Sequence, residues 1–221
     1  MNVFKVFDDI YISCIRNLSG GVGIKLRYYY YKRRLKYLGR NVIIDTGVFI
    51  SQPEYISIGD GTHIDKNCIL VASSPKLDLS DRILKFRENN YYQMNMGEIF
   101  IGKECHISQN TMLYGYAGIY LGDRFVMSEG SKIYSLTSMA YNPEDRTEIT
   151  FVTPYSGKSP TLMGPVSIED NVFIGIGCII SPGTHIGKNS FAKSYSVISG
   201  CFDSNVYLGG YPANVIRKRF E

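Results

Sequence analysis

The main pattern along the chain is an aliphatic residue that recurs at every sixth position from residue 44 onward, with small and polar residues between. Such a short repeat is typical of a solenoid, in which stacked units share one continuous core. We therefore expect each hexad to form one flat side of a triangular coil. The hexads begin at Ile44, Ile50, Ile58, Ile64, Leu70, Ile101, Ile107, Leu113, Leu121, Met127, Ile133, Ile168, Ile174, Ile180, Ile186, Ala192 and Ile198.

The interruptions of this repeat keep its phase. Two extra residues precede Ile58 and Leu121, and two longer excursions cover about 76–100 and 139–167. Each interruption follows the third side of a coil, so we expect all of them to leave from the same corner. An antiparallel sandwich would instead show alternation of apolar and polar residues and hairpin turns of the Asn-Gly kind. The fold class predicted is therefore all-β, a parallel β-helix.

The fifth position of many hexads holds a small residue, which suits a tight corner of the coil. These residues are Thr62, Cys68, Cys105, Thr111, Thr137, Cys178 and Thr184. The chain has five cysteines without disulfide or zinc spacing. We interpret the three at corners as buried, reduced thiols.

The segments before and after the repeat have other patterns. Residues 3–38 look helical, and segment 24–38 has an apolar face and a basic face before Gly39. The last residues contain a Gly-Gly-Tyr-Pro-Ala turn and a basic end. We therefore divide the chain into a helical N-terminal arm (1–40), the β-helix (41–208) and a C-terminal turn and tail (209–221).

The net charge of +4 is concentrated in the arm, between Lys25 and Arg40, where cations alternate with tyrosines. The remainder is slightly acidic, which does not favour binding to nucleic acid. The arm has two compatible interpretations. It covers the open edge of the first coil with its cations in solvent, or it also contacts an anionic membrane surface.

No apolar run approaches the roughly 18 residues that a membrane span needs. The N-terminus carries acidic residues where a signal peptide would have basic ones. We therefore expect a cytoplasmic protein with, at most, peripheral membrane contact.

Residues 104–135, 166–199 and 205–220 resemble the hexapeptide-repeat acyltransferases, and among them the sugar O-acetyltransferases of polysaccharide, galactoside and maltose acetylation. The last segment is similar to their Gly-x-Pro-Ala-x-x-Ile-Arg ending. The resemblance implies a left-handed parallel β-helix, a homotrimer, and acetyl-CoA as co-substrate along the outside of the coils. A histidine would act as general base on the acceptor hydroxyl.

The usual catalytic histidine of this family is absent here. The corresponding place, Ile133–Ala140, contains no histidine. His106 and His185 are the candidate bases, and His63 and the loop carboxylates Glu144 and Asp145 remain as alternatives. We expect His63 and His106 to be neighbours along one edge of the coil.

The resemblance also implies binding residues. The acyl-CoA candidates are Gly177, Lys193, Ser194, Ser199, Gly200, Arg217 and Lys218, although small residues also suit the coil itself. The acceptor candidates are Ser108, Asn110, Asp145 and Arg146, while Tyr91 and Tyr92 are candidates for stacking on a sugar ring. We predict no metal site, because the three histidines are far apart in sequence.

The function predicted is acetyl-CoA-dependent O-acetylation of a sugar hydroxyl in a surface polysaccharide or its precursor. The acceptor would be a sugar or a lipid-linked glycan. Two alternatives stay open: an N-acyltransferase acting on an amino sugar, and an inactive scaffold protein of glycan synthesis.

Overall fold

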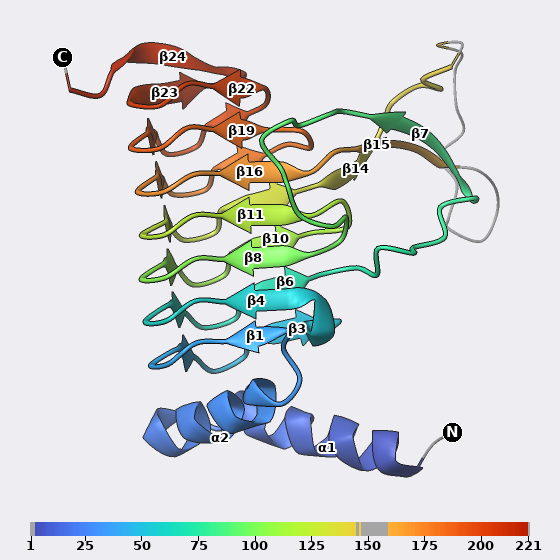
Figure 1. Cartoon of the computed structure of the whole chain (residues 1–221), viewed down its shortest axis with the longest axis vertical. Helices are drawn as coiled ribbons and strands as arrows, with labels where there is room; N and C mark the ends of the chain where they lie inside the picture. The colour runs from blue at the N-terminus through green and yellow to red at the C-terminus, as the bar shows by residue number, and fades with distance from the viewer. Residues whose placement is uncertain (1–2, 145, 147–158, 221) are drawn as a thin grey trace.

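A computed structural model describes residues 3–144, 146 and 159–220. The chain begins with two helices, α1 (Val3–Asn17) and α2 (Gly20–Lys32). It then winds upward through stacked short strands, with the helices beneath the first coil (Figure 1). Within the described residues, no helix is long and apolar enough to cross a membrane.

Three sheets of stacked strands form the sides of the solenoid, and the chain visits them in turn. The seven-stranded sheet contains β1 (Tyr37–Leu38), β4 (Ile56–Ile58), β8 (Ile99–Ile101), β11 (Ile119–Leu121), β16 (Val166–Ile168), β19 (His185–Ile186) and β22 (Cys201–Phe202). The eight-stranded sheet contains β2 (Ile43–Ile44), β5 (His63–Ile64), β9 (His106–Ile107), β12 (Val126–Met127), β17 (Phe173–Ile174), β20 (Phe191–Ala192), β23 (Val206–Gly210) and β24 (Ala213–Lys218). The six-stranded sheet contains β3 (Phe49–Ser51), β6 (Ile69–Val71), β10 (Met112–Tyr114), β13 (Lys132–Tyr134), β18 (Ile179–Ile180) and β21 (Val197–Ile198).

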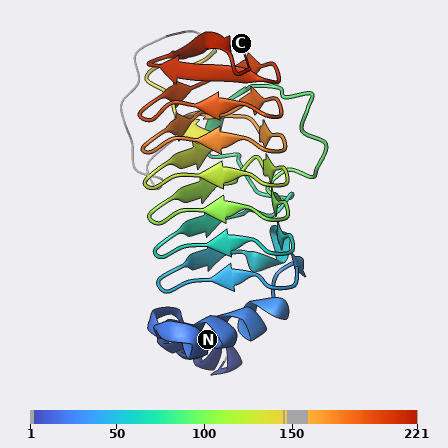
Figure 2. The same cartoon turned by 90° about the vertical axis from the view of Figure 1, so that its left-hand side faces the viewer.

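All pairs in these three sheets are parallel except the last, in which β24 returns antiparallel to β23. The coils are seen edge-on in Figure 2. The tail expected after residue 209 is therefore partly a strand. It continues the eight-stranded sheet, which provides partners for the backbone groups of the last coil.

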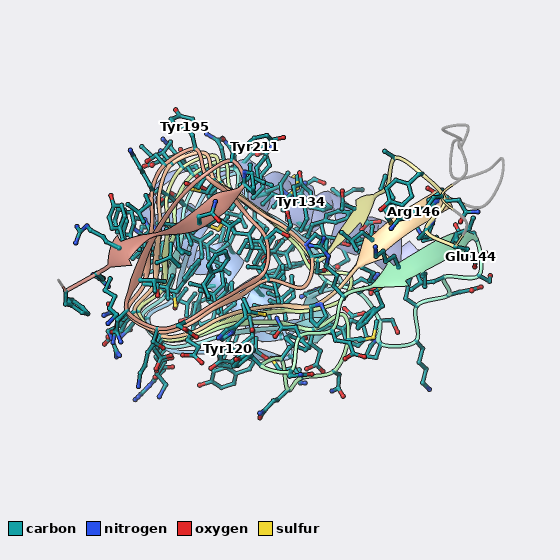
Figure 3. All side chains as sticks on the ribbon, turned by 90° about the horizontal axis from the view of Figure 1, so that it is seen from above. Tyr120, Tyr134, Glu144, Arg146, Tyr195 and Tyr211 are labelled. Carbon is teal, nitrogen blue, oxygen red and sulfur yellow. The ribbon has the colours of Figure 1, made fainter. Side chains whose placement is uncertain are left out.

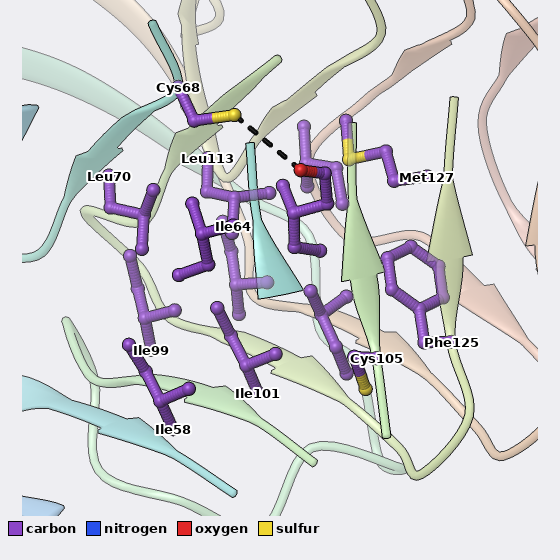
Figure 4. Packing of buried hydrophobic residues seen from close by; sticks show 14 of the residues in the cluster. Ile58, Ile64, Cys68, Leu70, Ile99, Ile101, Cys105, Leu113, Phe125 and Met127 are labelled. Carbon is purple, nitrogen blue, oxygen red and sulfur yellow. Dashed lines mark hydrogen bonds between the residues drawn. The ribbon is translucent and has the colours of Figure 1, made fainter. Parts of the chain in front are cut away.

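The aliphatic residues that begin the hexads point inward and stack from coil to coil. Apart from Ile50, which is half-buried, each is at most 1% exposed. Ile58 lies opposite Ile101, and Ile64 lies opposite Ile107 in the parallel register. Figure 4 shows this column with Leu70, Leu113 and Phe125. Burial of apolar surface along the whole axis is the main source of stability.

The small corner residues fill the places predicted for them, with one exception. Cys68, Cys105 and Cys178 are buried, and burial raises the pKa of the Cys105 thiol to about 11. Thiols with raised pKa values are mainly protonated at neutral pH, which agrees with a packing role. Thr137 is the exception, because it lies in β14 (Leu136–Ser138), outside the coil.

All interruptions leave the coil at one corner, where the chain passes from the six-stranded to the seven-stranded sheet. We call it the insertion corner. The two long excursions are not only loops, and the second leaves the coil earlier than predicted, with β14. Together β7 (Arg82–Phe86), β14 and β15 (Ser159–Met163) form a small separate sheet beside the solenoid (Figure 1). The short 3-10 helix η1 (Pro53–Tyr55) leaves at the same corner.

The helical arm differs from the predicted one at its end. α2 stops at Lys32, and Tyr37–Leu38 form β1, which pairs with Ser57–Ile58. Pairing with β4 provides backbone hydrogen bonds that an isolated final helical turn would lack.

Arg27 corrects the expectation that the cations of the arm form a solvated face. Its side chain is fully buried and donates to the carbonyls of Ile15 (2.8 Å), Leu18 (2.7 Å) and Ile44 (2.8 Å). It therefore ties both helices to the first coil. Lys25, Lys32 and Arg33 are exposed as expected.

Candidate functional site

The three histidines of the chain lie on two different sides of the solenoid. His185 begins β19 in the seven-stranded sheet, while His63 and His106 begin β5 and β9 in the eight-stranded sheet. The two candidate bases, His106 and His185, therefore belong to separate places in one chain. Each has to be judged by its own surroundings.

His185 is only 4% exposed and is held from two directions. The ring of Tyr91 lies flat on the imidazole, with ring centroids 3.6 Å apart and planes within 8°. Nδ1 forms a hydrogen bond of 2.9 Å with the hydroxyl of Ser167, its neighbour on β16. On the other side of the ring, Nε2 is 3.9 Å from Oε1 of Glu169.

Asn89 anchors the first excursion against this part of the sheet. Its amide nitrogen donates to the carbonyls of Thr184 (2.9 Å) and Pro165 (3.1 Å) and lies 3.1 Å from Oγ of Ser167. These bonds join segments that are up to 95 residues apart. They hold Tyr91, two residues further on, in place over His185.

Burial lowers the pKa of His185 below its ordinary value of 6.5, and the nearby carboxylates of Glu169 and Asp203 oppose this change in part. Desolvation disfavours the charged imidazolium, so the neutral ring dominates at neutral pH. A neutral imidazole is the form that accepts a proton.

A cavity of about 370 Å³ opens beside His185 on the outer face of the seven-stranded sheet. Its walls combine aromatic rings with charged groups: Tyr91, Gln93, Met94, Tyr120, Ser167, Glu169, Asp170, His185 and Lys188. In the view from above, Tyr120 lies on the opposite side of the prism from Tyr195 and Tyr211 (Figure 3). Aromatic rings beside hydrogen-bonding groups are a suitable lining for a sugar.

Asn89 and Ser167 were not found from the sequence, and neither lies in a motif that points to them. Ser167 is an ordinary outward position of a hexad, and Asn89 lies in an excursion without repeat.

Tyr91 was expected to stack on a sugar ring, but one of its faces is occupied by His185. Tyr92 turns back instead, and its hydroxyl donates to the carbonyl of Asn95 at 2.8 Å.

His106 lies in a different environment. His63 and His106 are neighbours, as predicted, with ring centroids 5.4 Å apart and planes within 20°. Asp65 binds both rings: Oδ1 is 3.1 Å from Nε2 of His63, and Oδ2 is 2.9 Å from Nε2 of His106. We predicted no metal site because the histidines are far apart in sequence. Stacking of successive coils places His63 beside His106, so their separation in sequence does not exclude a metal site.

The predicted acyl-CoA residues are divided between two corners. Gly177, Lys193 and Ser194 lie where the chain passes from the eight-stranded to the six-stranded sheet. A side chain at Gly177 would place its Cβ 2.7 Å from the Tyr195 ring, and φ is +65° there, so glycine suits this turn. Ser194 accepts a hydrogen bond from the Ile176 amide at 3.2 Å.

Ser199 and Gly200 lie at the insertion corner, next to His185. The amide of His185 donates to the carbonyl of Gly200 at 2.9 Å, and Arg87 donates to the hydroxyl of Ser199 at 2.6 Å.

Arg217 and Lys218 lie on β24, where the guanidinium of Arg217 is 4.9 Å from the centre of the Tyr207 ring. Of the predicted acyl-CoA residues, Ser199 and Gly200 therefore lie near His185, and the others lie at another corner or on β24.

The acceptor candidates are also separated. Ser108 is 5% exposed and follows β9, near the turn in which Asn110 has a φ of +59°. Arg146 is exposed in the second excursion, close to Glu144 and far to one side of the prism (Figure 3). Asp145 lies outside the described residues.

The repeat is matched by a family model, the hexapeptide repeat of succinyl-transferase, over residues 165–191. These residues of the chain carry the hexapeptide repeat of that family. The matched residues include Ser167, Glu169 and His185, whereas Tyr91 and Tyr120 of the same cavity lie outside them.

Several proteins similar to this chain are named as transferases. It is 29% identical to the galactoside O-acetyltransferase of Lactococcus lactis over 59% of the chain and 61% of the relative. It is 24% identical to the dTDP-4-amino-4,6-dideoxy-D-glucose acyltransferase of Escherichia coli over 83% of the chain and 82% of the relative. The aligned regions span between 50% and 61% of the length of four curated relatives.

Among solved structures, a mutant of AntD, an N-acyltransferase from Bacillus cereus in complex with dTDP-4-amino-4,6-dideoxyglucose and coenzyme A, is 23% identical. The TM-score is 0.67, with 88% of this chain and 90% of AntD covered. At this level of identity, the likeness supports a common fold.

Proposed function

We propose that this protein is an acyl-CoA-dependent acyltransferase that acetylates a hydroxyl of a sugar. The observation that carries the proposal is His185, a buried imidazole with a lowered pKa in the wall of a polar and aromatic cavity. The similarity to curated acetyltransferases supports the same class of reaction.

In the proposed reaction, His185 acts as general base through Nε2. If Nδ1 carries the proton, it donates to Ser167, whose own hydroxyl donates to Oδ1 of Asn89 at 3.2 Å. Nε2 then has a free lone pair for the acceptor hydroxyl. As the oxygen attacks the thioester carbonyl, a C–O bond forms, the C–S bond breaks, and the proton passes from His185 to the departing thiolate.

Glu169 has a supporting role in this scheme. Its carboxylate lies 3.9 Å from Nε2 and is 40% exposed. A carboxylate at this distance stabilises the imidazolium that forms during the reaction. Because Glu169 is partly solvated, its effect is smaller than that of a buried partner.

N-acylation of an amino sugar is the second candidate, and one observation favours it. The similarity to the dTDP-amino-sugar acyltransferase extends over more than four fifths of both chains, further than that to the galactoside enzyme. An amine that arrives neutral needs less help from a base than a hydroxyl does.

We also infer a left-handed coil and a homotrimer, as the family resemblance implies. Ile176, Ile179 and Tyr195 support an oligomeric contact, because they are 46%, 39% and 75% exposed around one corner. The exposed cations Lys25, Lys32 and Arg33 support peripheral contact with an anionic membrane from the cytoplasmic side. Co-sedimentation with anionic and neutral vesicles tests that contact.

The decisive experiment supplies acetyl-CoA with two matched acceptors, dTDP-6-deoxyglucose and dTDP-4-amino-4,6-dideoxyglucose, together with simple galactosides. Mass spectrometry then identifies the acetylated product. Acetylation of a hydroxyl supports the main proposal, and acetylation of the amine alone supports the second candidate. If calorimetry detects no binding of acetyl-CoA at millimolar concentration, both are wrong and the scaffold hypothesis is favoured.

A further inference from the structure

His63, Asp65 and His106 form a compact cluster on the outer face of the eight-stranded sheet. Their ligand atoms all lie within 4.8 Å of one another. The cluster is on a different side of the solenoid from His185, and the proposed transfer reaction does not use it. Its side chains are 39%, 25% and 46% exposed, so it is open to ions from solvent.

The coil holds the cluster rigidly. His63 and His106 occupy equivalent positions of β5 and β9 in the parallel register. The residues that follow them, Ile64 and Ile107, are fully buried in the core. The amide of Asp65 donates to the carbonyl of Ile107 at 2.9 Å, which fixes the carboxylate beside both rings.

We propose that His63, Asp65 and His106 bind a divalent transition-metal ion, with Zn²⁺ as the best match to two imidazoles and one carboxylate. Ligand bonds of about 2.0 Å in a tetrahedral site place the ligand atoms about 3.3 Å apart. The two observed nitrogen–oxygen distances, 3.1 and 2.9 Å, are close to this value. Because these distances run to different oxygens of Asp65 and the ligand atoms lie within 4.8 Å of one another, the side chains must rotate to bring all three onto one ion.

The chemistry of the donors disfavours Mg²⁺ and Ca²⁺. Mg²⁺ and Ca²⁺ prefer oxygen ligands, whereas imidazole nitrogen suits Zn²⁺, Ni²⁺ and Cu²⁺. To bind the ion, each Nε2 must present its lone pair, so the proton of each neutral ring lies on Nδ1. Ile43 and Val126 flank the two histidines along the sheet and provide an apolar surrounding. Three protein ligands leave one coordination position for water or for a group from another molecule.

The test is calorimetric titration of Zn²⁺ into the untagged full chain. Cys14 and Cys201 are exposed thiols that bind zinc, so both are first replaced by serine. We expect one saturable site per chain. Because loss of an outer-shell partner alone weakens metal sites about 10–100-fold, loss of a ligand in His106→Ala or Asp65→Asn should weaken binding at least ~100-fold.

The matched control is His185→Ala, which removes a histidine outside the cluster and should leave the affinity for Zn²⁺ unchanged. Cu²⁺ provides a second measurement: its electron paramagnetic resonance spectrum should show coupling to two nitrogens in the parent chain and to one in His106→Ala. The circular dichroism of each variant verifies the fold. If His106→Ala and Asp65→Asn bind Zn²⁺ like the parent, or if no site is detected, the proposal is wrong.

Discussion

Tyr91 lies flat against His185, with ring centroids 3.6 Å apart. The contact joins the first excursion to the seven-stranded sheet, and it covers one face of the imidazole while the ring remains part of the cavity wall. The low exposure of His185 therefore depends on a residue from a distant segment of the chain.

Replacement of His185 by alanine should lower the rate of acetyl transfer by about 10²–10⁴-fold, the usual contribution of a general base. Binding of acetyl-CoA should persist, because the substitution removes no predicted CoA contact. The measurement is release of free CoA, resolved by chromatography, in the presence of the acceptor. Lys132→Ala, an exposed residue of the six-stranded sheet, is the control, and equal rates for both variants would contradict the role of His185.

The pH dependence follows from the direction of the pKa shift. Since burial holds the pKa of His185 below 6.5, the base is neutral at pH 7 and becomes protonated only at lower pH. We therefore expect kcat/KM to be constant near pH 7 and to fall with an apparent pKa below 6.5. An acid limb centred above pH 6.5 would show that another group acts as the base.

Protonation of His185 should also destabilise the fold. A group whose pKa is lower in the folded state loses stability as the pH falls from its unfolded value, 6.5, through its folded value. The free energy of unfolding, measured with urea at several pH values, should decline in this window. In His185→Asn this part of the decline should vanish, while carboxylate effects at lower pH remain.

Two substitutions at Tyr91 distinguish the contribution of its stacked ring from that of its hydroxyl. Tyr91→Phe keeps the stacked ring and should leave the rate and the acid limb nearly unchanged. Tyr91→Ala removes the cover, so the apparent pKa of His185 should move upward, toward 6.5, as desolvation decreases. The loss of a stacked pair should also lower the free energy of unfolding by about 0.5–1.5 kcal/mol. Identical pH profiles for both variants would contradict this account.

Arg27→Met should destabilise the protein by about 3–5 kcal/mol, because it removes the donor to three buried or partly buried carbonyls. The carbonyls of Ile15, Leu18 and Ile44 would lose the guanidinium as a donor, and both helices would be held less firmly to the first coil. Urea unfolding followed by circular dichroism measures the change. Arg33→Met is the matched exposed control and should change stability by no more than about 0.5 kcal/mol; a similar loss in both variants would contradict the bridging role.

The sequence alone determined the solenoid, because a period of six is a local property that every coil repeats. Ile58, Ile64 and Leu70 could be placed in the core from spacing alone, and the phase of the interruptions predicted a common corner for both excursions. The pairing of His63 with His106 followed from the same rule. The local pattern predicted a helix as far as residue 38, whereas Tyr37–Leu38 form a strand because they pair with β4 of the coil.

Only the tertiary structure decided how the site is assembled. Asn89 and Tyr91 lie in an excursion without periodicity, so nothing in the sequence indicates that they contact Ser167 and His185. Asp65 acquires its place between two histidines because stacking brings distant coils together. Such contacts are set by closure of long loops and by packing against a finished sheet, and these depend on the whole folded chain and not on neighbouring residues.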